Sequence, residues 1–107
     1  MDAVVCLVTT PPDQAAPIAE ALVAREIVAC VNILAHVRSV YRWKGAVEHD
    51  DEALLVIKTT RAALPALDGA LRELHPYETF ELVALDVAGG SADYLAWIVE
   101  SVSPPQT

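Results

Sequence analysis

The feature that most constrains the fold is a β-rich segment from residue 27 to residue 57 that one glycine turn interrupts. β-Branched and aromatic side chains dominate its first half up to Trp43, and a second apolar run follows Gly45. Two such runs around a glycine predict an antiparallel hairpin. The hairpin is long for a small domain, and Ala35-His36 marks an expected bend or bulge within it.

The rest of the chain alternates between strand and helix patterns. A valine-rich run that two prolines end is typical of a strand buried on both faces, and apolar side chains at helical spacing predict amphipathic helices. Besides the hairpin, the predicted elements are a strand at residues 3–10, a helix ending near residue 26, a helix that Pro76 ends, a strand at residues 80–87 and a terminal helix after residue 91.

This order of elements predicts an α+β, ferredoxin-like βαββαβα sandwich with helices on one face of an antiparallel sheet. A chain of 107 residues is small, so we expect one domain over residues 1–107, with residues 103–107 as a frayed tail. The helices leave the other sheet face without cover, and the long hairpin leaves unpaired edges. Closed association of several copies would satisfy both needs.

The apolar content also favours association. The hydrophobic fraction is 54% and the mean hydropathy is +0.38, which is high for so short a chain. No apolar run approaches the roughly 20 residues that a membrane-spanning helix needs, and the first residues lack the positive region of a signal peptide. We therefore expect a cytoplasmic protein, without a membrane partner, that covers its surplus apolar surface by binding to itself.

The charge balance bears on possible partners. Fifteen acidic and seven basic side chains give a net charge of −8, and the basic residues are scattered along the chain. Nucleic-acid binding needs a basic patch, so we do not expect a nucleic-acid partner. Four of the acidic side chains gather at residues 48–52, where a solvated loop is favoured over a cation site.

Polar and aromatic groups concentrate in three stretches, residues 29–33, 39–45 and 75–78. Together with the run that ends at Lys58 and the Asp-Tyr-Leu-x-Trp motif at residues 93–97, they resemble the signature of the CutA family, in order and over nearly the whole chain. The resemblance implies a ferredoxin-like fold and a homotrimer packed around a three-fold axis. It also implies a role in divalent-cation tolerance and the response to metal ions, with copper binding.

The copper ligands that the resemblance implies are only partly present. In the family they include a cysteine late in the first strand and two consecutive histidines before Pro-Tyr, whereas this chain has Thr9 at the first place and Leu74 before His75. His75 is therefore the metal ligand carried over, for copper or another divalent cation, and we expect no cofactor to be required for folding. Near a helix C-terminus an imidazole also caps carbonyls, and this structural role of His75 is favoured.

A small-ligand cleft between subunits is the other candidate site. Residues that would give it apolar walls and a few convergent charges are Cys30, Tyr41, Trp43, Lys58, His75, Tyr77 and Glu81. The aromatic members also have a plainer explanation as core or interface residues. Cys30 has no basic neighbour in the sequence, which favours a packed thiol over a reactive one.

Three functions are compatible with these features. The first is a metal-responsive homotrimer of the CutA type. The second is a trimeric signalling module resembling the PII proteins, which would bind a small anionic metabolite in the intersubunit cleft, although a glycine-rich phosphate loop is lacking. The third, an enzyme that uses Cys30 or His75, ranks last because the sequence holds no recognised nucleophile motif, so we do not expect an enzyme.

Overall fold

The computed structural model describes residues 2–104. Its strands and helices are β1 (Ala3–Thr10), α1 (Ala15–Ala24), β2 (Cys30–Trp43), β3 (Ala46–Thr60), α2 (Leu64–Leu74), β4 (Val83–Asp86) and α3 (Ala92–Ser101). This order confirms the predicted βαββαβα architecture. Within the described range, none of the helices combines the length and the apolar character that crossing a bilayer requires.

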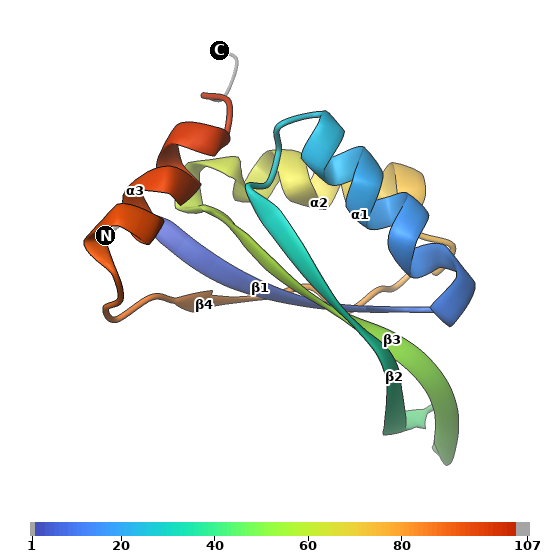
Figure 1. Ribbon diagram of the computed structural model, residues 1–107. Helices are drawn as coiled ribbons and strands as arrows, with labels where there is room; N and C mark the ends of the chain where they lie inside the picture. The colour runs from blue at the N-terminus through green and yellow to red at the C-terminus, as the bar shows by residue number, and fades with distance from the viewer. Residues whose placement is uncertain (1, 105–107) are drawn as a thin grey trace.

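The four strands form one antiparallel sheet in the order β2-β3-β1-β4, and the helices lie on one side of it (Figure 1). β1 is a central strand whose side chains alternate between the two faces. Val4, Cys6 and Val8 are buried on the helix side, whereas Val5 and Leu7 point to the opposite side and are less buried. The predicted α+β sandwich with helices on one face is therefore confirmed.

The core fills the space between the sheet and the first two helices. Leu22 of α1 and Leu67 and Leu71 of α2 are fully buried against Leu55 and Ile57 of β3. The leucines of α2 recur at helical spacing, so they form one apolar stripe that faces the sheet. Burial of each such side chain contributes about 1.5–3 kcal/mol relative to exposure.

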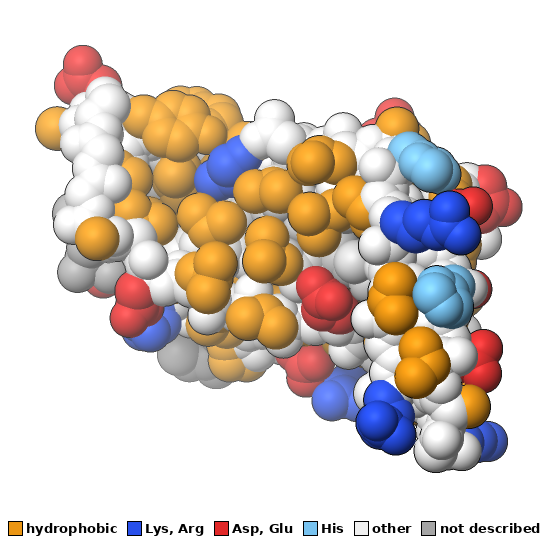
Figure 2. All heavy atoms as spheres, turned by 90° about the horizontal axis from the view of Figure 1, so that it is seen from below, with side chains coloured by type: hydrophobic (Ala, Val, Ile, Leu, Met, Phe, Trp, Pro, Cys, Tyr) orange, Lys and Arg blue, Asp and Glu red, His pale blue; other side chains and the backbone are white. Residues whose placement is uncertain are grey.

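The sheet face opposite the helices carries apolar side chains that the described chain does not cover, and Figure 2 shows them gathered across its centre. Val83 and Leu85 of β4 are each 47% exposed, and Leu34 of β2 is 45% exposed. We term this surface the open face, and strand alternation assigns to it Val5, Leu7, Leu34, Leu54, Val56, Val83 and Leu85.

β2 and β3 continue together beyond the body as a curved two-stranded arm, residues 37–52 (Figure 1). The predicted bulge is confirmed, because the pairing shifts between Leu34 and Val37. The acidic residues 48–52 lie within β3 rather than in a solvated loop, so that prediction is wrong. The segment becomes a strand because it pairs with β2 residue by residue as far as Trp43.

Two further predictions differ from the structure. The strand predicted at residues 80–87 is limited to Val83–Asp86. Pairing between β1 and β4 ends at Leu7, and the carbonyl of Thr9 contacts the His75 ring instead of β4. In the tail predicted to fray, the Ser103 amide donates a hydrogen bond of 2.9 Å to the Glu26 carbonyl. Residues 105–107 of that tail lie outside the described residues.

Candidate functional site

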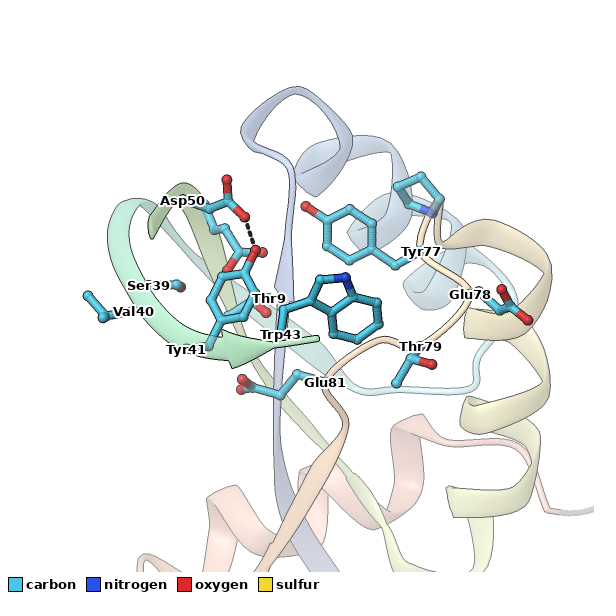
Figure 3. A pocket seen from close by; sticks show the side chains of 12 residues that line it. Thr9, Ser39, Val40, Tyr41, Trp43, Asp50, Tyr77, Glu78, Thr79 and Glu81 are labelled. Carbon is cyan, nitrogen blue, oxygen red and sulfur yellow. Dashed lines mark hydrogen bonds between the residues drawn. The ribbon is translucent and has the colours of Figure 1, made fainter. Parts of the chain in front are cut away.

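A cavity of about 710 Å³ lies between the arm and the segment that leads from α2 to β4. Figure 3 shows Tyr41 on the arm side of this cavity, with Trp43 and Tyr77 facing it. The arm supplies Tyr41 and Trp43 because alternate residues of a strand share a face. Tyr77 follows Pro76, which ends α2 and turns the chain back over the cavity.

The structure brings some of the seven predicted site residues together and separates the others. Tyr41, Trp43, Tyr77 and Glu81 all line the cavity, within a single chain. His75 is not a lining residue, but its ring lies 4.9 Å from the ring of Tyr77 between centroids.

Cys30 and Lys58 lie elsewhere, as a directly opposed pair on β2 and β3. The Cys30 sulfur is 3.6 Å from the Tyr94 hydroxyl of α3, and the Lys58 ammonium donates to the side-chain oxygen of Asn32. These two residues therefore do not share the cavity with the aromatic residues in this chain.

His75 is buried, with 7% of its surface exposed, and both of its ring nitrogens have partners. Nδ1 accepts a hydrogen bond of 3.1 Å from the Tyr77 amide, so Nε2 carries the proton and donates to the Thr9 carbonyl at 2.8 Å. The ring also stacks on Phe80 at 5.3 Å between centroids. These contacts favour the structural role of His75, because binding a metal would require one hydrogen bond to be given up.

Asp50 and Glu52 of β3 also line the cavity, although the sequence predicted a solvated loop for both carboxylates. The register places Asp50 opposite Ser39 and Glu52 opposite Val37, so both carboxylates share a face with the aromatic residues of the arm. The available signal was the spacing of two between Glu48, Asp50 and Glu52, which is the period of a strand.

Three ionisable groups of the cavity hold their protons more tightly than they would in water. A hydrogen bond to Asp50, then burial and nearby carboxylates, raises the pKa of Tyr41 to about 12. Burial, together with the charges of Glu52 and Asp50, raises the pKa of Tyr77. Burial and the charge of Glu52 also raise the pKa of Glu81. The cavity therefore favours the neutral, protonated forms of these groups, and the part of the effect that comes from the carboxylates would also attract other positive charges.

The Tyr41 phenol gives a pH-dependent test of this arrangement. Its pKa rises from an ordinary 10.0 to about 12, so the folded protein binds more protons than the unfolded chain between these values. Stability should therefore fall as the pH rises through this window. In the Asp50→Asn variant we expect the ultraviolet absorbance of ionised tyrosine to appear at lower pH, because the neutral amide does not hold the phenol proton.

The matched control is Asp51→Asn, since Asp51 lies opposite Arg38 and near the His36 ring, outside the cavity lining. A titration curve that both variants shift equally, or that neither shifts, would contradict the assignment.

The acidic side chains of the cavity raise the question of metal coordination. Among residues 2–104, no group of three or more His, Cys, Asp or Glu side chains lies close enough together to hold a metal ion. Asp50, Glu52 and Glu81 are instead distributed around a space large enough for a small organic molecule.

The sequence matches a family model described as CutA1 divalent ion tolerance protein over residues 4–101. It is 46% identical over 98 residues to the divalent-cation tolerance protein CutA of Thermus thermophilus, covering 91% of this chain and 95% of that protein. It is 44% identical over 100 residues to the human protein CutA, covering 90% of this chain but 56% of that longer protein.

Solved structures give the same result. The divalent cation tolerance protein of Thermus thermophilus superposes with a TM-score of 0.92 at 44% identity, covering 94% of this chain and 99% of the other. A protein described as PII-like protein CutA from Nostoc sp. PCC 7120, in apo form, superposes with a TM-score of 0.89 at 33% identity. That match covers 95% of this chain and 99% of the Nostoc chain.

Proposed function

This chain belongs to the CutA1 divalent ion tolerance family, and we propose that it acts in divalent-cation tolerance as a homotrimeric binding protein rather than as an enzyme. The observation that carries the proposed assembly is the apolar open face, on which Val83 and Leu85 are each nearly half exposed. We further propose a cytoplasmic location.

Self-association explains the open face better than solvation does. Contiguous apolar surface of this kind marks an interaction site in most soluble proteins. The arm extends away from the body, and its exposed Val47 would gain cover from another chain. A closed ring of identical chains buries one patch on every copy and leaves none free, and three copies are the family arrangement proposed here.

Copper binding is the finer part of this proposal. The hydrogen bonds of His75 argue against a tight preformed site there, and a single imidazole would give weak affinity. We expect Cu(II) and Zn(II) to bind weakly, through exposed imidazoles such as His36 and His49 or through the acidic arm.

The role in tolerance can be tested by complementation. Expression of this chain should restore growth of a bacterium that lacks its own CutA protein on medium with raised copper, cobalt or zinc. An inert protein of similar size, expressed to the same level, controls for nonspecific metal buffering. Equal growth with both proteins would overturn the proposed function.

A second candidate function is a PII-like module that binds a small metabolite, and the cavity is the observation that favours it. The predicted anionic metabolite suits this cavity poorly, because Asp50, Glu52 and Glu81 line it and none of its lining residues is basic. A ligand of the opposite charge would be attracted.

A further inference from the structure

Glu52 is a buried carboxylate without a charge partner. It is 6% exposed, and among residues 2–104 no hydrogen bond or ion pair reaches it, although neighbouring Asp50 and Asp51 both have partners. No fully enclosed side-chain nitrogen or oxygen lacks a hydrogen bond in the described chain, so the Glu52 oxygens lie at the cavity wall. Because a buried charge is costly unless it is compensated, this wall is suited to a positive ligand.

The other walls of the cavity are aromatic. The rings of Tyr41, Trp43 and Tyr77 come from two separate segments and surround the space in Figure 3. In the single chain they are 39%, 50% and 39% exposed, so the chain itself leaves part of each ring open to a ligand. The faces of aromatic rings attract cations, and indole does so most strongly.

Charge and size together decide the class of cation. A hard divalent ion needs several oxygens at one point, whereas the cavity has no cluster of this kind among the described residues. A volume of about 710 Å³ falls within the range of small-molecule sites. Rings beside separated carboxylates fit a cation that is bulky, partly apolar and weakly hydrated.

We propose that this cavity binds an organic ammonium ion, with the cationic group against Tyr41, Trp43 and Tyr77 and with Glu52 as the buried counter-charge. Glu81 and Asp50 lie on the same cavity and would contact further donor groups of the ligand. The proposal rests on the small-molecule role given above as the second candidate function, and it replaces an anionic ligand by a cationic one.

A pair of matched probes isolates the charge. Choline and 3,3-dimethylbutan-1-ol have nearly the same shape, but only choline carries a positive charge. By isothermal titration calorimetry on the assembled full chain, we expect choline to bind on the order of 100-fold more tightly than the alcohol, through ring and carboxylate contacts together. Equal affinities for the two probes would overturn the proposal.

Two variants test the named contacts. Glu52→Gln keeps the shape but removes the charge, and Trp43→Ala removes the largest ring, so each should weaken choline binding by roughly 10-fold or more. The matched control for loss of one carboxylate is Glu20→Gln, at an exposed position of α1. This variant should bind choline as the native chain does. Folded assembly of each variant is checked by circular dichroism and sedimentation.

Further titrations separate two claims: that the cavity binds a small molecule, and that this molecule is an organic ammonium ion. If ATP or citrate binds and choline does not, the small-molecule role stands and the ammonium class is wrong. If none of these compounds binds, both ideas fail. If Mg²⁺ or Cu²⁺ binds with an affinity that Glu52→Gln abolishes, the occupant is an inorganic ion and the proposal is overturned. Choline binding together with failed complementation would leave the site standing and reject the tolerance role.

Discussion

The Val83→Asp variant is expected to be monomeric at concentrations where the native chain forms the proposed trimer of 11.5 kDa subunits. Val83 lies on the open face and is 47% exposed in the single chain, so an aspartate there can be solvated in the monomer. In the trimer each chain would bury one unpaired carboxylate, which costs several kcal/mol per ion. Weakening by about 4 kcal/mol per interface corresponds to roughly 1,000-fold in affinity.

The same substitution at Val23 provides the control. Val23 is 42% exposed on α1, away from the open face, so Val23→Asp introduces an equal charge at similar exposure. Sedimentation-velocity or mass-photometry measurements should show trimers of Val23→Asp and monomers of Val83→Asp. If Val83→Asp remains trimeric, the open face is not the contact surface. If the native chain is itself a stable monomer, the proposed assembly is wrong.

The second large effect concerns stability. His75→Ala should lower the free energy of unfolding by about 2–4 kcal/mol, through loss of two hydrogen bonds and of packing against Phe80 and Tyr77. Urea denaturation at one fixed protein concentration measures this difference, because association also contributes to apparent stability.

His49→Ala is the matched control, since His49 is exposed on the arm and its removal should change stability by less than about 0.5 kcal/mol. Calorimetry with Cu(II) on the same variants separates the two interpretations of His75. A folded His75→Ala protein that loses most of its copper affinity, at little cost in stability, would establish ligation and contradict the structural role.

Much of the fold was predictable because its signals are local. Helical spacing of leucines, the prolines that end elements and the Gly45 turn each act within a few residues, and together they specify the order of strands and helices. The same order of elements indicated a sheet face that the helices do not cover, and Val83 and Leu85 are exposed on that face.

The candidate site was harder to predict because it depends on contacts between distant segments. The His75 ring meets the Thr9 carbonyl across 66 positions of sequence, and no local pattern encodes this hydrogen bond. Glu52 is polar and lies among other acids, a composition that favours exposed loops, yet strand pairing buries it. The prediction placed Cys30 and Lys58 with the aromatic residues. Only the pairing register of β2 and β3 shows that these two residues lie outside the cavity.

The bulge between Leu34 and Val37 decides which side of the arm each β2 residue occupies. Before the bulge, even-numbered residues of β2 lie opposite even-numbered residues of β3, as in the pair Leu34 and Leu54. Beyond the bulge, odd-numbered residues of β2 lie opposite even-numbered residues of β3, as in the pair Tyr41 and Glu48. If the pairing continued past Leu34 without this shift, Arg38 and Arg42 would lie on the acidic side, and Tyr41 and Trp43 would point away from it. This shift of one position in the register thus determines whether the arm neutralises its own carboxylates or leaves them for a ligand.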